Sequence, residues 1–326
     1  MKAVTFNVPG GSEVLSVSQV ARPQIGPGEV LIAVRAAGVN RPDIAQRTGR
    51  YPVPADASPI LGLEVAGEIA EIGEGVTGFA RGDRVMSLVH GGGYAEFCKA
   101  DHRHVIPVPD ALGDVEAAGF PEVAMTVEFN MVMRAALSSG EAALIHGGSS
   151  GIGAYAVARA LSLRARPMTT SRGAAKSEFC RSIGADPAID SAGTDWSRIV
   201  REATDGRGVD VVLDMVGGDY TNRNLASMAA DGRYALISLQ GGREVTVDLE
   251  PVLRKRLTLV GSTLRPLSPE VKAKIVQHVR REVIPLLARG KLKPHVHKVF
   301  SLEDVCEAHR MMERGEHFGK IVLSLD

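Results

Sequence analysis

The chain has 326 residues, of which 44% are hydrophobic and 23% charged, and its formal net charge at pH 7 is zero. This length and composition are typical of a soluble globular protein with room for two domains. The balanced charge gives no overall field that favours nucleic acid or an anionic membrane. There is no run of 18 apolar residues, and residues 1–6 resemble a strand and not a signal peptide, so we expect a cytoplasmic protein.

The first 120 residues alternate short β-type runs with turns rich in glycine and proline. Clear examples of such runs are residues 29–35, 65–72 and 83–88. This pattern predicts an irregular, β-rich, barrel-like domain.

From Glu122 onward the pattern changes to regular strand–helix alternation, after a helical run that continues to Ser139. Such alternation predicts an α/β fold with a doubly wound parallel sheet that helices cover on both faces. Helices are expected at 154–163, 174–183 and 195–204. The expected strands are residues 142–146, 166–171, 186–190, 209–216, 232–239 and 257–263.

The last 60 residues are too few for a core of their own. A long helix at 268–289 is followed by two short strands, at 295–300 and 319–325, which flank a helix that begins at Ser301. We expect this segment to pack on the first domain. The predicted domains are therefore residues 1–121 with 266–326, and residues 122–265.

The strand at 142–146 ends in a glycine- and serine-rich turn, His146-Gly147-Gly148-Ser149-Ser150-Gly151-Ile152-Gly153. A strand that leads through such a turn into a helix directs main-chain N–H groups and the helix dipole at a pyrophosphate. The motif predicts a dinucleotide site. Short-chain dehydrogenases share a similar turn, but they carry it near the N-terminus and follow it with Tyr-x-x-x-Lys, which is missing here.

The second strand of a dinucleotide fold ends where the ribose 2′ position is recognised. An acidic residue there would favour NAD, whereas this chain has Ser171 and Arg172, with Lys176 shortly after. Cations and hydroxyl donors suit a phosphate, so we predict NADPH as the cofactor. The fourth, fifth and sixth strands also end in small residues, at 214–218, 239–242 and 260–264, and we expect these loops to share one crevice.

Taken together, the motifs resemble a zinc-independent medium-chain dehydrogenase/reductase of the NADPH:quinone oxidoreductase family, in particular its p53-inducible branch. The resemblance implies a GroES-like first domain, a Rossmann second domain and a homodimer that pairs at the sixth strand. The motifs that carry it are residues 38–43, 49–51, 61–67, 91–96, 121–126, 145–153, 261–265 and 319–323.

The resemblance also implies roles for individual residues. Asn40 and Thr126 correspond to contacts of the nicotinamide, and Ser171, Arg172 and Lys176 to the 2′-phosphate site. The pyrophosphate turn corresponds to Gly148, Ser149, Ser150, Gly151 and Ile152. The remaining positions around the cofactor are Val216, Gln240, Ser262, Leu264 and Lys320. One departure is Ser191, where many relatives have a tyrosine near the adenosine phosphate.

Zinc is not expected. Zinc-dependent relatives have a cysteine at the position of Asn40 and a histidine at that of Leu63, and zinc sites require such ligands. The three cysteines, Cys98, Cys180 and Cys306, lie far apart and form no CxxC pair. His102 with His104 and His295 with His297 are interpreted as exposed strand histidines.

The resemblance implies transfer of a hydride from NADPH to a quinone. Tyr51 is a candidate proton donor, although water can also protonate a reduced quinone. An alternative is an enoyl or 2-alkenal reductase of the same fold. A third possibility, from another class, is an NADPH-binding crystallin-like or RNA-binding protein with little turnover, against which the neutral charge argues.

Overall fold

The computed structural model describes residues 1–51 and 53–325, so Pro52 and the final residue of the expected 266–326 segment lie outside the described residues. It divides the chain into two compact units. Unit 1 comprises Met1–Met125 and Arg265–Asp326, and unit 2 comprises Thr126–Leu264. The division falls a few residues from the expected boundaries, inside the helix that begins at Pro121.

Unit 1 contains a seven-stranded sheet in the order β14-β15-β3-β4-β5-β7, with β6 also paired to β3. A separate antiparallel pair, β1 with β2, accompanies it. The strands are β1 Lys2–Thr5, β2 Ser16–Gln19, β3 Glu29–Val39, β4 Glu64–Ile72, β5 Arg84–Leu88, β6 Phe97–Asp101, β7 Val105–Pro107, β14 Val296–Ser301 and β15 Lys320–Ser324. The helices are α1 Arg41–Arg47, α2 Asp114–Ala118, α9 Pro269–Glu282, α10 Ile284–Ala288 and α11 Val305–Arg314.

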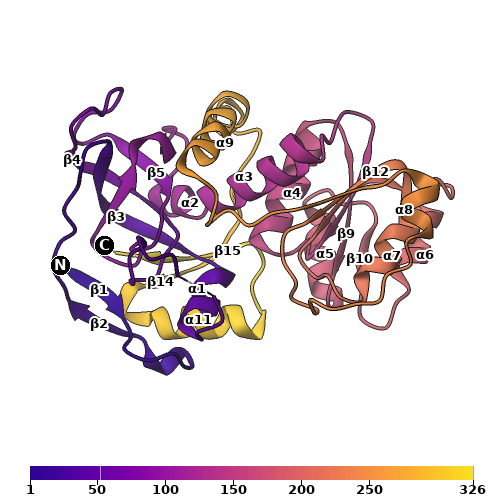
Figure 1. The fold of residues 1–326 in the computed structure, drawn as a ribbon, viewed down its shortest axis with the longest axis horizontal. Coiled ribbons are helices and arrows are strands. Elements are labelled where there is room, and N and C mark those ends of the chain that lie inside the picture. Colours follow the sequence, from indigo (N-terminus) through magenta and orange to yellow (C-terminus); the bar gives the residue numbers. More distant parts are fainter. Residues whose placement is uncertain (52, 326) are drawn as a thin grey trace. The chain divides into compact units, whose positions relative to one another are not determined.

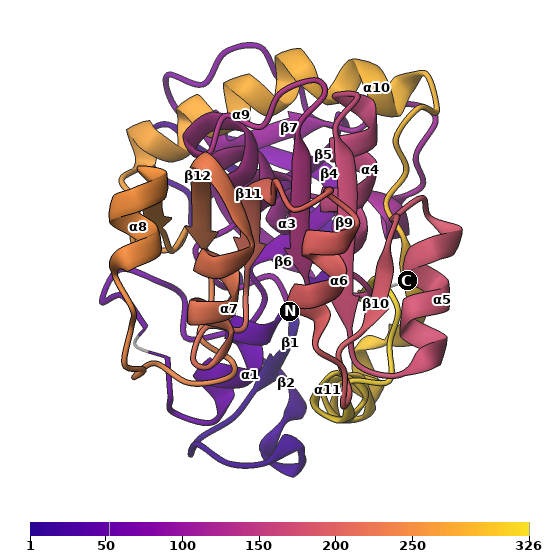
Figure 2. The same ribbon diagram turned by 90° about the vertical axis from the view of Figure 1, so that its right-hand side faces the viewer.

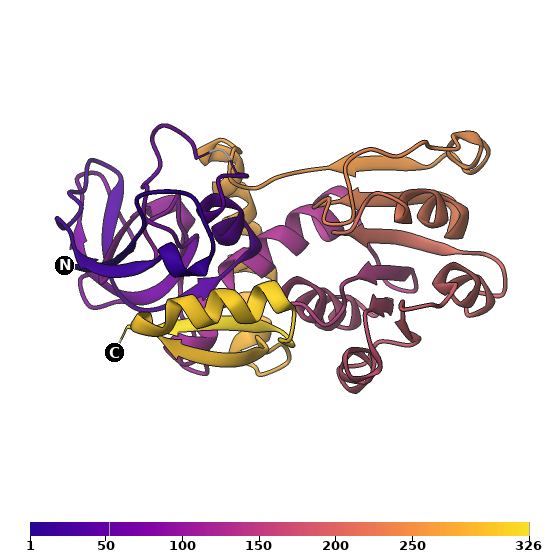
Figure 3. The ribbon, with the colours of Figure 1, turned by 90° about the horizontal axis from the view of Figure 1, so that it is seen from below.

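The C-terminal segment completes this sheet, as the sequence predicts. Strand β15 pairs antiparallel with β3, with Ile321 opposite Val39 and Leu323 opposite Ala37. Figures 1 and 3 show the last strands and α11, in yellow, among the indigo strands of unit 1. Ile321 and Leu323 are fully buried in one hydrophobic cluster with side chains from β3, β4 and α11. Residues about 280 positions apart in sequence therefore form one core.

Two expectations about unit 1 are wrong in detail. The long helix at 268–289 is interrupted at Val283, because Pro285 has no N–H to continue the helical ladder and its ring crowds the preceding turn. His102 and His104 lie in a 3-10 turn, His102–His104, and not on one face of a strand. His104 is buried, and its Nε2 lies 3.0 Å from the Pro269 carbonyl oxygen.

Unit 2 has a six-stranded sheet in the order β10-β9-β8-β11-β12-β13, in which all neighbours are parallel. The strands are β8 Ala142–His146, β9 Arg166–Ser171, β10 Ala188–Asp190, β11 Val209–Asp214, β12 Met228–Leu236 and β13 Thr258–Gly261. The helices are α4 Gly151–Ser162, α5 Ala174–Ser182, α6 Trp196–Glu202, α7 Tyr220–Ser227 and α8 Glu250–Lys255.

This order confirms the predicted doubly wound α/β fold. Successive strands are added on one side from β8 to β10 and on the other side from β11 to β13, and ligands of such sheets bind outside the strand ends where this order reverses, between β8 and β11. Every residue of β8 and β11 is buried, which is typical of a sheet covered on both faces. Within unit 2, Figure 2 shows α5 near β10 and α8 near β12, on opposite flanks of the sheet.

The helical run expected to continue to Ser139 is shorter than predicted. Helix α3, Pro121–Val127, continues as a π-helix over Glu128–Arg134. Among the described residues, no helix has the length and apolar character required to cross a membrane.

Candidate active site

In unit 2 the turn between β8 and α4 has the geometry of a phosphate cradle. Ser150 caps α4, because its Oγ accepts a hydrogen bond from the Gly153 N–H at 3.0 Å. A Cβ on Gly153 would lie 2.3 Å from the Gly147 carbonyl oxygen, and one on Gly148 would lie 2.6 Å from Thr169 Cβ. Only glycine allows this close approach, and the turn leads into the N-terminus of a twelve-residue helix. These residues fit the pyrophosphate of a dinucleotide.

A buried polar network connects the strand ends at this turn. His146 Nδ1 lies 2.7 Å from Thr170 Oγ1, and its Nε2 lies 2.7 Å from Asn224 Oδ1. Asn224 Nδ2 donates to Asp214 Oδ2 at 3.1 Å, and the Tyr234 hydroxyl donates to the same oxygen at 2.6 Å. Burial lowers the pKa of His146, which favours the neutral ring. The network fixes the ends of β8, β9 and β11, and sequence reasoning missed it.

The end of β9 carries the residues predicted for the 2′ position. Ser171 is buried, with its Oγ 3.1 Å from Ser177 Oγ, whereas Arg172 is exposed. Lys176 lies in the first turn of α5. Ser191, the departure from the resemblance, donates its hydroxyl to the Ser171 carbonyl oxygen at 3.1 Å. Asp190 accepts hydrogen bonds from the N–H groups of Gly173 and Ala192, which lower the pKa of its carboxyl.

The other predicted cofactor residues of unit 2 follow the later strands. Gln240 is exposed and its N–H donates to the Met215 carbonyl oxygen, and Val216 is half-buried. Thr126 and Leu264 are both buried. The Ser262 hydroxyl donates to Asn130 Oδ1 at 2.7 Å, and Asn130 Nδ2 donates to the Thr126 carbonyl oxygen at 2.9 Å. Ser262 and Thr126 are thereby connected through one amide.

In unit 1, Asn40 lies at the start of α1, where its N–H donates to Asp43 Oδ2 at 2.8 Å. Its side-chain amide is held at both ends. Nδ2 donates to Glu64 Oε1 at 2.9 Å, and Oδ1 accepts from Lys320 Nζ at 2.6 Å. All three side chains are buried. Strands β4 and β15 thus fix the orientation of the Asn40 amide.

The ammonium group of Lys320, which the resemblance places near the cofactor, makes all its described contacts with groups of unit 1. Besides Asn40, its ammonium contacts Glu64 Oε1 at 2.6 Å and the Val39 carbonyl oxygen at 3.1 Å. Three acceptors of unit 1 thus match the three N–H donors of a lysine. Glu64 Oε2 accepts from the Glu122 N–H at 2.8 Å. We assign Lys320 to the support of Asn40.

Asp43 belongs to a second buried network. It accepts hydrogen bonds from the Gly62 N–H and from the Tyr94 hydroxyl, both at 3.1 Å. Burial raises the pKa of its carboxyl to about 6. Beyond Tyr94 the network continues through His309 to Arg47, whose guanidinium pairs with Glu313. No local sequence motif predicts these contacts.

Tyr51 is half-buried, and its ring centroid lies 5.4 Å from the guanidinium carbon of Arg265. Burial raises the pKa of its hydroxyl. The positions that hold zinc ligands in relatives carry the Asn40 amide and the apolar Leu63. The described part of the chain contains no group of three or more histidine, cysteine, aspartate or glutamate residues arranged to bind a metal ion.

Tyr155 and Arg159 are the nearest approach to a short-chain catalytic pair, and both serve the core of unit 2. The Tyr155 hydroxyl donates to Glu128 Oε1 at 2.9 Å, and Arg159 Nε donates to the same oxygen at 2.7 Å. Glu128 and Arg159 are almost fully buried. The trio joins α4 to the π-helix and presents no free group for catalysis.

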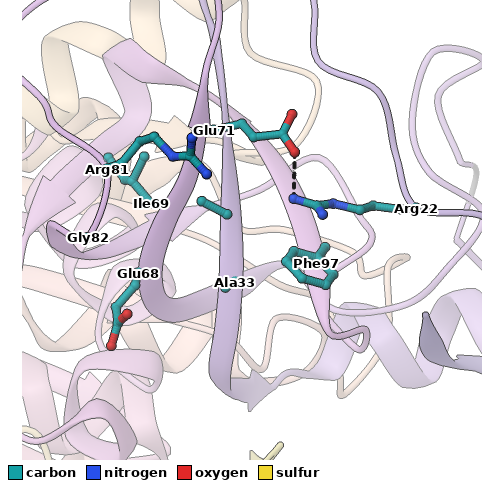
Figure 4. A pocket seen from close by; sticks show the side chains of 9 residues that line it. Arg22, Ala33, Glu68, Ile69, Glu71, Arg81, Gly82 and Phe97 are labelled. Atoms are coloured by element: carbon teal, nitrogen blue, oxygen red, sulfur yellow. Dashed lines mark hydrogen bonds and ion pairs between the residues drawn. The ribbon is translucent and has the colours of Figure 1, made fainter.

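Figure 4 shows a separate shallow pocket on unit 1, over β3, β4 and β6. Arg22 pairs with Glu71 at 2.6 Å and stacks on Phe97, with its guanidinium carbon 4.0 Å from the ring centroid. Both ion-pair partners are nearly half exposed, so this is a solvated charged surface worth little to stability. It holds none of the predicted site residues.

Two family models match the chain. Residues 26–134 match the alcohol dehydrogenase GroES-like domain, and residues 183–323 match the zinc-binding dehydrogenase domain. Among curated proteins, a phenolphthiocerol/phthiocerol polyketide synthase of Mycobacterium tuberculosis is 33% identical over 329 residues, which cover 97% of this chain. The chain spans 14% of the length of that relative.

Solved structures match over nearly the full length. A mycobacterial quinone oxidoreductase has a TM-score of 0.87 and 30% identity, with 99% of both chains covered. The Escherichia coli quinone oxidoreductase complexed with NADPH has a TM-score of 0.89 and 26% identity, with 99% of this chain and 100% of that one covered. The CurK enoyl reductase has a TM-score of 0.87 and 28% identity, with 99% and 98% covered. The chain belongs to the medium-chain dehydrogenase/reductase superfamily.

Proposed function

We propose that this protein is an NADPH-dependent, zinc-independent quinone reductase of the NADPH:quinone oxidoreductase family. The glycine turn between β8 and α4 is the observation that carries the proposal, because its close main-chain approach fits a pyrophosphate. The mycobacterial and Escherichia coli quinone oxidoreductases support the choice of substrate class.

The preference for NADPH depends on the end of β9. Arg172 is exposed and follows Ser171 directly, and Lys176 adds a second positive charge. The carboxylate of Asp190 is engaged by the N–H groups of Gly173 and Ala192, so it orders the turn. Guanidinium and hydroxyl donors suit the 2′-phosphate. Equal kcat/KM with NADPH and NADH, or a preference for NADH, would contradict this assignment.

When bound, NADPH supplies the hydride. The protein positions the nicotinamide and donates a proton to the reduced substrate. Glu64 and Lys320 hold the Asn40 amide in one orientation for contact with the nicotinamide. Tyr51 is the proposed donor to the oxyanion that develops on the reduced substrate, in parallel with water. The Asn40 amide and the Leu63 side chain offer neither thiolate nor imidazole to zinc.

A second candidate is the reduction of α,β-unsaturated carbonyl compounds, which the similarity to the CurK enoyl reductase and to a polyketide synthase favours. NADPH oxidation against benzoquinones, naphthoquinones, 2-alkenals and enoyl thioesters tests both candidates. Quinone turnover well above enone turnover supports the first proposal, and the reverse supports the second. A protein that binds NADPH but reduces none of them, and shifts RNA in a salt-dependent manner, would instead match the binding-protein alternative.

We further propose a homodimer that pairs at β13. Within the described residues β13 pairs only with β12, and Leu259 on this strand is 49% exposed. An unpaired edge with apolar side chains is a template for a second strand. Sedimentation velocity of the wild type should give a dimer, and Leu259→Lys should weaken it; a monomeric wild type would overturn the proposal.

A further inference from the structure

Two buried cations in unit 1 have no anionic partner among the described residues. Arg265 and Lys272 are 6% and 8% exposed. Arg265 Nη1 donates to Gln46 Oε1 at 2.7 Å, and Lys272 Nζ donates to the Arg265 carbonyl oxygen at 2.8 Å. Both acceptors are neutral. Burying a cation is costly unless an anion compensates for the lost water, so this pair requires an explanation.

The free donors of Arg265 have a particular geometry. Its Nε and Nη2 are buried and have no hydrogen-bond partner in the described part of the chain. These two nitrogens lie on one edge of the planar guanidinium and direct their N–H groups in parallel. Two oxygens of a carboxylate or phosphate match that edge. Gln46 occupies only Nη1, so the edge suited to an oxyanion is the one that remains available.

The charges around this edge leave it positive. Asp43 is directed at other groups of unit 1, because its carboxylate accepts hydrogen bonds from the N–H groups of Asn40 and Gly62. Asp56 is exposed to solvent, and its Oδ1 lies 3.3 Å from His90 Nε2. Two further carboxylates act on the cluster, Glu122 and Asp101, and Asp101 pairs with Arg103 at 2.6 Å. Burial lowers the pKa of Lys272, and the positive charge of Arg265 lowers it further.

The cluster adjoins the proposed proton donor, because the Arg265 guanidinium carbon lies 5.4 Å from the Tyr51 ring centroid. We infer that Arg265 and Lys272 bind a carboxylate or phosphate carried by the substrate, so that the preferred substrates are anionic conjugated carbonyl compounds. This inference rests on the proposed reductase function and narrows its substrate class.

Two matched substrate pairs test it and separate the two sources of the oxyanion. The first pair is 4-oxopent-2-enoate and its methyl ester, and the second is crotonyl phosphopantetheine and crotonyl pantetheine. We expect the wild type to favour the anionic member of at least one pair by about 10- to 100-fold in kcat/KM, as charge-assisted hydrogen bonds predict. Preference within the first pair alone identifies a carboxylate, and preference within the second alone identifies a phosphate.

Variants locate the effect. Arg265→Gln and Lys272→Gln should reduce the preference, and Arg265→Lys should do so partly, because it keeps the charge but loses the planar fork. Lys274→Gln is the matched control, since Lys274 is exposed on the same helix and should leave the preference intact. Thermal unfolding of each variant shows whether it is folded.

Binding gives a readout that does not depend on turnover. Isothermal titration calorimetry can measure the binding of saturated 4-oxopentanoate and of phosphopantetheine to the cofactor-free protein. We expect the wild type to bind at least one of them, and we expect Arg265→Lys and Lys272→Gln to weaken that binding. If no conjugated substrate is reduced but this binding persists, the reductase proposal fails and the oxyanion site stands. If the wild type treats both members of each pair equally, or if Arg265 variants lose only NADPH affinity, the oxyanion site is overturned.

Discussion

The candidate site of unit 2 consists mainly of main-chain groups, whereas that of unit 1 consists of side chains. In unit 2 the site is a run of consecutive residues. Main-chain N–H groups and the space left by glycine are its main features for binding a pyrophosphate. In unit 1 the site consists of side chains from distant parts of the chain, such as Asn40, Glu64 and Lys320. A main-chain site tolerates few changes of shape, whereas a side-chain site depends on charge balance.

The largest expected effect concerns the buried charge of unit 1. Lys320→Met leaves the Glu64 carboxylate buried beside a neutral side chain, and removal of one partner from such a pair costs about 3–5 kcal/mol. Denaturant unfolding should show the loss. Lys274→Met, at an exposed position, is the control. A cost similar to that of the control would mean that the Lys320–Glu64 ion pair contributes no net stability.

The next effect concerns the shape of the turn in unit 2. Gly153→Ala places a methyl group 2.3 Å from the Gly147 carbonyl oxygen, and relief of such overpacking costs about 1–3 kcal/mol. We expect a lower melting temperature together with at least a tenfold loss of NADPH affinity, measured by fluorescence titration. Gly26→Ala in unit 1, far from the turn in the sequence, is the matched change, because its nearest neighbour lies at an ordinary 3.6 Å. Normal NADPH binding by Gly153→Ala would remove the turn from the cofactor site.

A smaller effect should appear as pH dependence in unit 1. Burial, with the charge of Arg47, lowers the pKa of His309 from 6.5 to about 3. At pH values between these two pKa values, the His309 ring is protonated in the unfolded chain but not in the native state. Stability therefore falls as the pH drops below 6.5. His309→Asn should remove about 1–2 kcal/mol of this loss between pH 6.5 and 5.

Asp43 acts in the opposite direction, because its raised pKa of about 6 makes stability fall as the pH rises from 4 to 6. The wild-type curve contains both contributions. Unfolding of wild type, His309→Asn and Asp43→Asn at a series of pH values separates them. Parallel curves for wild type and His309→Asn would show that His309 titrates normally.

The smallest effect concerns cofactor selectivity. Arg172→Gln should lower the preference for NADPH over NADH by about fivefold in kcat/KM, because an exposed charge contributes roughly 1 kcal/mol. Arg181→Gln, an exposed arginine later in α5, should not change the preference. If both variants behave alike, general electrostatics and not a contact at Arg172 accounts for the preference.

The same difference between the units explains what the sequence could predict. Strands β8 and β9 have the predicted bounds, 142–146 and 166–171, because β8 is an apolar run, β9 contains two β-branched threonines, and turn residues follow both. The doubly wound fold follows from that alternation. The break at Val283 was missed, since the apolar pattern continues through it. The contact of Lys320 with Glu64 depends on β15 lying beside β3, and that long-range register leaves no local pattern.

The pairing of β15 with β3 also has a consequence for synthesis on the ribosome. Thr126–Leu264 is one continuous segment, so unit 2 has all its strands before residues 265–326 emerge. Unit 1 must wait with residues 36–39 of β3 unpaired on one side and the Glu64 carboxylate without its ammonium partner until residues 320–324 are made. During that interval its exposed strand edge is a target for chaperones, and the synthesis of β15 is the event that closes the sheet.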